Sequence, residues 1–311
     1  MSVETPTTTG AAGPLVSIGL PCYRRPEALQ VALRSLLAQT YRNLEIFVHE
    51  NPSEVDGIEA AVREVAGDDP RVVFRRHSEN IGPSGNFESV LNRANGPYFM
   101  WAADDDEWHP EFVERLVERL EADPAYIAAA SGLEVVDARG ARLSVFDRFS
   151  RFDRPDRAER LRAYLAEPEL LGKANLIYGL YRTEAVREAW AVWKPTPALT
   201  VWGSDIVLVF AAFVRGPWAF VDRVLMTKRS PKVSKRRSWQ AFPEDFGPPT
   251  AVFDDYEAAL LEVCPDDAAR DVVRDVMSAR RRRLRWVSSW RRPLGRMITR
   301  LVLAVTGGAR P

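Results

Sequence analysis

Short apolar segments alternate with helix-type segments through the first 120 residues, and this alternation constrains the fold more than any other feature. The apolar runs predict strands at residues 16–20, 44–48, 71–76 and 98–102. The spacing of apolar residues between and after these strands predicts four helices. The first begins at Arg25-Pro26, and the other three cover residues 58–65, 84–94 and 110–120. Strands that alternate with helices favour right-handed crossovers and a mainly parallel sheet. The predicted fold class is therefore α/β.

Polar side chains follow three of these strands at the point where each strand ends. They are Cys22-Tyr23-Arg24, Glu50-Asn51 and Asp104-Asp105-Asp106. In an open parallel sheet, ligands bind outside the carboxyl ends of the strands. We therefore expect these three clusters to converge on one crevice.

Length and composition indicate a globular protein. The 311 residues suggest one large domain or two closely packed ones, with 46% hydrophobic and 28% charged residues and a formal net charge of zero. The two cysteines, Cys22 and Cys264, fit neither a disulfide scaffold nor a zinc site, which favours a reducing compartment. We interpret residues 1–13 as a disordered leader and not a signal peptide, and no apolar run reaches the roughly 20 residues of a membrane span. The expected location is cytoplasmic.

The remainder of the chain is less regular. Strands are predicted at residues 127–136 and 218–226, and helices at 157–165 and 206–214, with a polar aromatic loop at 146–154 between them. Residues 268–305 show helical spacing and a crowd of arginines, with a break or kink at Pro293.

The aspartate run is the sharpest chemical feature. Asp104, Asp105 and Asp106 directly follow a predicted buried strand, and adjacent carboxylates repel one another unless water or a cation neutralises them. Mg²⁺ typically takes one or two protein carboxylates together with substrate phosphates. The run therefore indicates a metal–diphosphate site. The alternative is a solvated acidic turn that caps the next helix, since acidic residues favour helix N-termini.

Three segments together resemble the family 2 glycosyltransferases. They are VSIGLPCYRR at 16–25 with Gln39-Thr40-Tyr41 and Leu44-Glu45-Ile46 behind it, NIGPSGN at 80–86, and YFMWAADDDEWHP at 98–110. Each segment alone is weak evidence for the family, but their order and spacing together are specific, because they mark successive strand ends of one fold. The resemblance covers roughly residues 14–230 and is strongest up to about residue 120.

The resemblance implies a GT-A fold and a defined reaction. It divides the chain into a nucleotide-sugar-binding half at 14–125, an acceptor-binding half at 126–235 and a helical, arginine-rich extension at 236–311. It also implies an inverting, single-displacement transfer from a nucleoside-diphosphate sugar to an acceptor hydroxyl, assisted by Mn²⁺ or Mg²⁺. Its acceptors include glycans, glycolipids and natural products.

The resemblance also carries roles for individual residues. The positions implied to bind the nucleotide are Pro21, Tyr23, Arg24, Glu50, Asn51, Arg76 or Arg75, Asn80, Gly82 and Asp104. Asp105 matches the principal metal ligand, with Asp104 and Asp106 beside it. The chain departs from the family pattern at Asn51, Pro52 and Ala103, which stand where many members have an acid, a glycine and the first carboxylate.

A general base is needed to take the proton of the acceptor hydroxyl. Asp205, about a hundred residues after the aspartate run, matches the family's position, with Ser204 in place of the usual preceding acid. The structural alternative for Asp205 is a helix cap or first-turn acid. Trp108 and Trp202 are candidates to stack on sugars, whereas Trp101 is expected in the core.

Basic residues offer two further predictions. Lys228, Arg229 and Lys232 are candidates to stabilise the leaving diphosphate, or else form a solvated loop. The arginine-rich tail is either a helix packed on the domain or a basic amphipathic helix in peripheral contact with a membrane, which would suit a lipid-linked acceptor. Nothing else in the sequence supports nucleic-acid binding.

Two other functions remain open. A sugar-phosphate nucleotidyltransferase would normally carry a glycine-rich, basic loop after the first strand, whereas this chain has Leu20 to Arg25 without a glycine run. A non-catalytic binding module on a degenerate version of the fold is favoured by Asn51, Ala103 and Ser204. Retention of Asp104, Asp105 and Asp205 argues against it.

Overall fold

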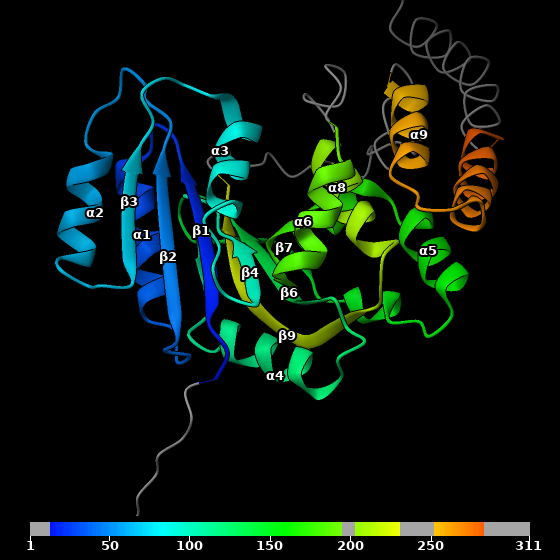
Figure 1. Ribbon diagram of the computed structural model, residues 1–311, viewed down its shortest axis with the longest axis horizontal. Coiled ribbons are helices and arrows are strands. Elements are labelled where there is room, and N and C mark those ends of the chain that lie inside the picture. The colour runs from blue at the N-terminus through cyan, green and yellow to red at the C-terminus, as the bar shows by residue number, and fades with distance from the viewer. Residues whose placement is uncertain (1–12, 195–202, 231–251, 283–311) are drawn as a thin grey trace, which may run out of the picture.

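A computed structural model describes residues 13–194, 203–230 and 252–282 of the chain (Figure 1). In its first half, strands and helices alternate as β1 (Val16–Cys22), α1 (Pro26–Leu37), β2 (Leu44–Glu50), α2 (Ile58–Ala66), β3 (Val72–Arg76), α3 (Gly82–Leu91), β4 (Tyr98–Trp101), β5 (Asp106–Trp108) and α4 (Phe112–Ala122). The second half contains β6 (Ala128–Val136), β7 (Arg142–Phe146), α5 (Arg157–Ala166), β8 (Leu180–Arg182), α6 (Thr183–Val192), α8 (Ser204–Phe213), β9 (Trp218–Arg229) and α9 (Phe253–Glu262).

The strands form one nine-stranded sheet in the order β3-β2-β1-β4-β8-β6-β9-β5, with β7 paired to β6. The four strands β3, β2, β1 and β4 are parallel to one another. Every residue of β1 is buried, as expected for a central parallel strand covered on both faces. The chain runs outward from β1 through β2 to β3 and then returns to β4 on the other side. This reversal between β1 and β4 is the place where open α/β sheets bind ligands.

The second half of the sheet is mixed. Strand β8 is antiparallel to both of its neighbours, β4 and β6. Strand β6 is parallel to β9. Strand β5 pairs antiparallel with β9, and β7 pairs antiparallel with β6. The β5–β9 pairing sets Asp106 beside Lys228 and Trp108 beside Met226. It therefore carries the aspartate run from the end of β4 across to the far part of the sheet.

Helices cover both faces of the sheet. Figure 1 shows α4 on one side, where it packs on β6 and β9, and α3 and α6 on the other. Helix α3 contacts β1 and β2, and α8 packs against α6. Gln39, just after α1, accepts from the Val113 amide of α4 at 3.0 Å and donates to the His109 carbonyl at 2.9 Å, which fixes α4 against the end of α1.

The structure extends some predicted elements and adds others. Pro21 does not stop β1, because its fixed φ still suits an extended strand and its register partner is His49 of β2. The short strands β5 and β8 have three residues each, too few to show a periodic pattern. Strand β7 and helix α6 were not predicted either, and the loop expected at 146–154 contains a short 3-10 turn at Phe149–Phe152.

A buried ionic cluster joins the C-terminal helices to the second half of the sheet. We call it the buried triad, and it consists of Glu169, Lys173 and Arg280. Residues 267–282 are helical. Arg280 donates to both carboxylate oxygens of Glu169 at 2.7 and 2.5 Å, and Lys173 lies 3.1 Å from Glu169. The adjacent Arg281 pairs with Asp254 and Glu257 of α9. In the described part of the arginine-rich tail, these two arginines therefore face the protein.

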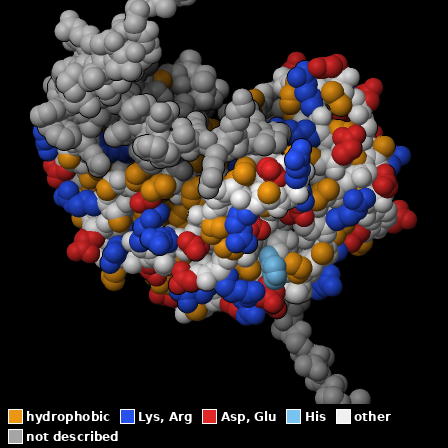
Figure 2. All heavy atoms as spheres, turned by 180° about the vertical axis from the view of Figure 1, so that it is seen from behind, with side chains coloured by type: hydrophobic (Ala, Val, Ile, Leu, Met, Phe, Trp, Pro, Cys, Tyr) orange, Lys and Arg blue, Asp and Glu red, His pale blue; other side chains and the backbone are white. Residues whose placement is uncertain are grey.

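The predicted leader at residues 1–12, the kink at Pro293 and the tail beyond residue 282 lie outside the described residues. Among the helices that are described, none has the length and apolar character needed to cross a bilayer. On the face shown in Figure 2, basic and acidic side chains are interspersed, as the zero net charge suggests.

Candidate active site

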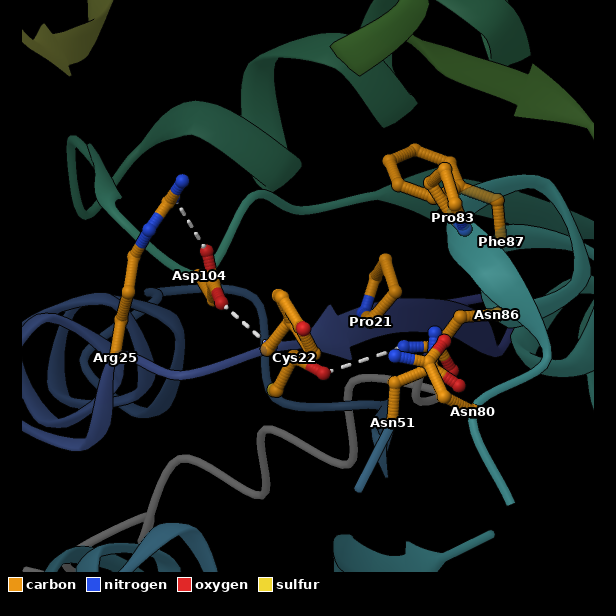
Figure 3. A pocket seen from close by; sticks show the side chains of 10 residues that line it. Pro21, Cys22, Arg25, Asn51, Asn80, Pro83, Asn86, Phe87 and Asp104 are labelled. Atoms are coloured by element: carbon orange, nitrogen blue, oxygen red, sulfur yellow. Dashed lines mark hydrogen bonds and ion pairs between the residues drawn. The ribbon is translucent and has the colours of Figure 1, made fainter. Parts of the chain in front are cut away.

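A cavity of about 440 Å³ opens at the reversal point between β1 and β4 (Figure 3). Its lining comes from the end of β1, the loop after β2, the start of α3 and the loop after β4: Pro21, Cys22, Tyr23, Arg25, Asn51, Asn80, Pro83, Asn86, Phe87 and Asp104. Figure 3 shows Arg25 reaching toward Asp104 on one side of the cavity, with Pro83 and Phe87 on the other. The expected convergence of the strand ends on one crevice is thus present in the structure.

Two buried asparagines shape one wall of the cavity. Asn51 donates from Nδ2 to the carbonyl of Gly82 at 2.9 Å and accepts from the amide of Ile81 at 3.2 Å. Asn86 donates to the carbonyl of His49 at 3.0 Å. The Asn51 amide is therefore used to hold the start of α3 beside the ends of β1 and β2, and an aspartate there would lose the bond to Gly82.

Several residues expected in the nucleotide pocket lie behind or beside the cavity and do not line it. Arg24 adopts a positive φ of 64° and pairs with Glu54 at 2.5 Å, so its side chain turns away and Arg25 takes the place on the cavity wall. Glu50 is 1% exposed and lies 3.8 Å from Arg76. Gly82 contributes its left-handed φ of 73° and its carbonyl to the turn before α3.

Asp104 lines the cavity, Asp105 follows it in the chain outside the lining, and Arg25 pairs with both carboxylates. Asp104 accepts from the amide of Tyr23 at 3.0 Å through Oδ2 and from Arg25 at 3.1 Å through Oδ1. Asp105 accepts from the same Arg25 nitrogen at 2.5 Å. Burial raises the pKa of Asp104 to about 6, although the bonds from Tyr23 and Arg25 work against this rise. We call Arg25, Asp104 and Asp105 the site cluster.

Asp106 has other partners than Asp104 and Asp105, and its role as a metal ligand stays a prediction. Its side chain is buried within the β5–β9 pairing, where Oδ1 accepts from the amide of Arg229 at 3.0 Å. Its other oxygen, Oδ2, has no hydrogen-bond partner and lies 3.9 Å from the ammonium of Lys228. Alternation along β5 turns Asp106 inward, because successive strand residues point to opposite faces.

Asp205 lies in the first turn of α8 on the other side of the aspartate run. Burial raises the pKa of Asp205, and the bond from the Ile206 amide and the nearby Lys228 ammonium oppose this effect. Tyr178 is close to Lys228, whose ammonium lies 5.3 Å from its ring centroid, and burial, followed by the charges of Asp106 and Asp205, raises the pKa of its phenol. Lys228 also donates to Asn175 at 3.2 Å.

The remaining predicted contacts are changed by burial and pairing. Trp108 is only 3% exposed, because it shares the inward face of β5 with Asp106, and its stacking on a sugar stays a prediction. Trp101 is fully buried, as expected, and donates to the carbonyl of Phe87. Arg229 is paired with Glu107, whereas Trp202 and Lys232 lie outside the described residues.

The site cluster can accept a divalent cation only with help from a ligand. Within the described residues, no group of three or more histidine, cysteine or acidic side chains is placed to hold a metal ion. Two hard carboxylates, Asp104 and Asp105, do stand together at the cavity edge. This donor set fits Mg²⁺ or Mn²⁺ when phosphate oxygens and water complete the coordination.

Sequence reasoning missed three residues of this region. Arg25 and Arg24 are adjacent and alike in type, so only the backbone turn distinguishes them. Asn86 ends the segment NIGPSGN at 80–86, but the sequence does not indicate that its side chain is buried beside the ends of β1 and β2. Tyr178 follows no recognisable motif, because it reaches the site from a 3-10 turn at Lys173–Tyr178.

Comparison with known proteins places this geometry in a family. Residues 17–166 match the family model described as Glycosyl transferase family 2. An uncharacterized glycosyltransferase of Rickettsia felis is 34% identical over 131 residues, which are 42% of this chain and 21% of that protein. A GalNAc(5)-diNAcBac-PP-undecaprenol beta-1,3-glucosyltransferase of Campylobacter jejuni is 28% identical over 115 residues, 37% of each chain. The chain thus spans about a fifth of the Rickettsia protein and just over a third of the Campylobacter one.

Solved structures show the same fold. The crystal structure of S. aureus TarS 1-349 in complex with UDP-GlcNAc matches 85% of this chain and 71% of its own, with a TM-score of 0.56 at 16% identity. The mannosyltransferase PcManGT from Pyrobaculum calidifontis, in complex with GDP-Man and Mn²⁺, matches 95% of this chain and 87% of its own, with a TM-score of 0.50 at 17% identity. At these identities the likeness concerns the fold alone, which is GT-A.

Proposed function

This chain belongs to glycosyl transferase family 2 through its residues 17–166, and on that premise we propose that it transfers a sugar from a nucleoside-diphosphate donor to an acceptor hydroxyl. One observation carries the proposal: the cavity at the β1–β4 reversal has the Asp104–Asp105 pair at its edge. A nucleotide in the cavity would bring its diphosphate to these carboxylates. The donors bound by TarS and PcManGT, UDP-GlcNAc and GDP-Man, are of this chemical class.

The cavity walls supply what a nucleoside needs. Pro21, Tyr23 and Phe87 offer apolar surface for a base or ribose, and Asn80 and Tyr23 add polar groups. Such a mixture of apolar lining and a few polar groups is typical of small-molecule sites. Because the Asn51 amide is already engaged with Gly82 and Ile81, base selection falls to other groups of the wall.

Asp104 and Asp105 would hold Mn²⁺ or Mg²⁺ together with the donor diphosphate. When bound, the cation supplies Lewis-acid stabilisation of the leaving diphosphate. The side chains have their own part: the Tyr23 amide orients Asp104, and Arg25 offers a guanidinium next to the diphosphate position. Guanidinium groups bind phosphate oxygens through paired, charge-assisted hydrogen bonds.

Asp205 would act as the general base of an inverting displacement. It stands in the first turn of α8, and the Lys228 ammonium, which opposes the rise in its pKa, also lies 3.9 Å from Asp106 of the aspartate run. Burial raises its pKa, which makes the carboxylate a better proton acceptor than an exposed aspartate. Its Oδ1 accepts from the Ile206 amide at 2.9 Å, which orients the carboxylate that would take the acceptor proton.

The acceptor would be a hydroxyl of a glycan, a glycolipid or a natural product. The Campylobacter relative is named for a lipid-linked glycan, which supports an acceptor of the glycan or glycolipid type. Both cysteines are free and buried, in keeping with a reducing compartment, and we place the reaction in the cytoplasm.

A thermal-shift experiment tests the donor site directly. UDP, dTDP, GDP and their sugars are each added with Mn²⁺, with Mg²⁺ or with chelator, and the unfolding midpoint is measured. A ligand at a hundred times its Kd adds about 2.7 kcal/mol of stability, which is readily detected. We expect metal-dependent stabilisation by one nucleotide in the wild type and its loss in Asp105→Ala. Absence of stabilisation by any nucleotide would favour the non-catalytic binding module.

A further inference from the structure

Arg25 occupies the same carboxylate oxygens that a divalent cation needs. Its guanidinium contacts Oδ1 of Asp104 at 3.1 Å and Oδ2 of Asp105 at 2.5 Å, and the second oxygen of Asp104 is held by the Tyr23 amide. A cation between the two carboxylates would have to displace Arg25, because both would use the same lone pairs and both are positive. Arg25 and the metal are therefore competitors for the site cluster.

The structure lets Arg25 leave without disturbing the fold. Its backbone is fixed at the start of α1, where its carbonyl accepts from the Leu29 amide at 2.9 Å. Its side chain, however, is 53% exposed; Asp105 is 31% exposed and Asp104 is 9% exposed. The Arg25–Asp105 pair is therefore partly solvated, and ion pairs of this kind are weak and exchange readily with other partners. Only the long side chain has to move.

A second partner for Arg25 lies within reach. Arg25 lines the nucleotide cavity together with Asp104, so a diphosphate bound there would meet the guanidinium as well as the carboxylates (Figure 3). A guanidinium matches phosphate oxygens at least as well as carboxylates. When the diphosphate takes Arg25, the two carboxylates lose their counter-ion at the moment the donor arrives.

We propose that Arg25 makes metal binding depend on the donor: it holds Asp104 and Asp105 while the cavity is empty and transfers to the diphosphate when a nucleotide binds. The inference rests on the proposed donor site. It predicts positive coupling between metal and nucleotide, and such coupling is reciprocal, so each ligand strengthens the other by the same factor. Removal of Arg25 should strengthen binding of the metal alone and weaken the coupling.

The test compares Arg25→Gln with Arg34→Gln. Arg25 immediately precedes α1, whereas Arg34 lies within it; the Arg34 side chain is 55% exposed and pairs with Glu64 at 3.7 Å, so the control removes the same charge from a similarly exposed position nearby. Binding of Mn²⁺ is measured from the decrease in the electron paramagnetic resonance signal of free Mn²⁺, without nucleotide and with UDP or GDP. Unfolding midpoints of the variants verify that they are folded.

We expect Arg25→Gln to bind Mn²⁺ alone roughly three- to tenfold more tightly than the wild type, the range expected for loss of competing exposed ion pairs. Its affinity should also rise less when nucleotide is added. Arg34→Gln should match the wild type, and Arg25→Lys, which keeps the charge without the planar fork, should fall between. Adding Asp105→Ala to Arg25→Gln should remove the extra affinity.

Three results would count against the proposal, and they have different meanings. If the wild type binds Mn²⁺ more tightly with nucleotide but Arg25→Gln binds Mn²⁺ alone no more tightly than the wild type, the role of Arg25 is overturned and the proposed donor site stands. If neither protein binds Mn²⁺ or nucleotide under any of these conditions, the proposed function fails and this inference fails with it. Extra affinity that survives Asp105→Ala would also overturn the role of Arg25, since the metal would then lie elsewhere.

Discussion

The site cluster and the buried triad contain the same kinds of charged groups in opposite surroundings. In the site cluster, Arg25 is half-exposed and reaches two carboxylates at the mouth of a cavity. In the buried triad, Lys173 is fully buried and bonds to Glu169 and to the carbonyls of Tyr164 and Glu167. A solvated pair exchanges partners at little cost, whereas a buried and fully bonded charge is costly to leave unpaired. The first arrangement suits ligand exchange, and the second suits attachment of the C-terminal helices.

In the buried triad, burial and ion pairing have opposite effects on the pKa values of Glu169 and Lys173. Burial raises the pKa of Glu169, but the Lys173 and Arg280 cations outweigh it, so the pKa of this carboxyl lies below its usual value. Burial lowers the pKa of Lys173 to about 8, with Glu169 opposing this shift. Both groups thus remain charged near neutral pH, and the triad holds α9 and residues 267–282 against the second half of the sheet.

The largest effect is expected on the rate of sugar transfer, from substitution of Asp205, the proposed general base. Asp205→Asn keeps an oxygen that can accept from the Ile206 amide but removes the proton acceptor, so we expect sugar transfer to fall by about 10²- to 10⁴-fold. Donor binding and the unfolding midpoint should stay close to those of the wild type. Initial rates of transfer, with thermal shift by the nucleotide as the binding measure, check this.

The matched control for that substitution is Asp222→Asn, which makes the same change at an exposed position of β9. It should leave the rate unchanged. Normal transfer by Asp205→Asn would show that another group takes the acceptor proton.

The second prediction compares equivalent substitutions in the two clusters. Glu169→Gln leaves the fully buried Lys173 and the largely buried Arg280 without their carboxylate, so we expect a loss of about 3–5 kcal/mol in the free energy of unfolding. Asp105→Asn removes one charge from a solvated pair and should change stability by less than about 1 kcal/mol. Urea denaturation of the two variants measures both values. Equal losses would show that burial does not separate the clusters as we argue.

The first half of the fold was predictable because each strand there is a continuous apolar run that ends in polar residues. Parallel strands covered on both faces leave such a pattern in any sequence. The cavity residues Tyr23, Asn51 and Asp104 follow from the strand ends alone, since topology brings these ends together, whereas Pro21 was expected there only through the family resemblance.

The second half resisted prediction because its pairings join distant residues. The inward orientation of Asp106 and Trp108 depends on three residues of β5 and on a partner strand about 120 residues away, so no local pattern reveals it. For the same reason the three aspartates, which look equivalent in sequence, divide into two that pair with Arg25 and one that is buried in the β5–β9 pairing. The distinction between Arg24 and Arg25 depends on a single positive φ, which residue type alone does not indicate.

A third prediction concerns the pH dependence of the free energy of unfolding, through the buried His49 of β2. Burial, and after it the charges of His77 and two arginines, lowers the pKa of His49 from 6.5 to about 4. Between these values the unfolded chain binds a proton at His49 that the folded chain refuses, so stability rises with pH and is lost as pH falls from 6.5 to 4. The contribution is about 3 kcal/mol over this window.

The measurement is the free energy of unfolding at several pH values for the wild type and His49→Asn, which keeps a polar partner for Ser89. Asp104 and Asp106, whose pKa values burial raises to about 6, oppose the trend in both proteins and cancel in the difference. The variant should lose less stability on acidification. Parallel pH profiles of the two proteins would contradict the assignment to His49.

The smallest effect is expected next to the buried triad and sharpens the same contrast within one helix. Arg281 pairs with Asp254 at 2.6 Å and with Glu257, and its side chain is 35% exposed, whereas the side chain of the adjacent Arg280 is 15% exposed and reaches the buried Glu169. We expect Arg281→Gln to change the free energy of unfolding by no more than about 1 kcal/mol, as for other solvated pairs. Arg280→Gln should cost more, because it leaves Glu169 with Lys173 as its remaining cation. Urea denaturation of the two neighbours decides whether burial, and not the number of ion pairs, determines how firmly the C-terminal helices are held.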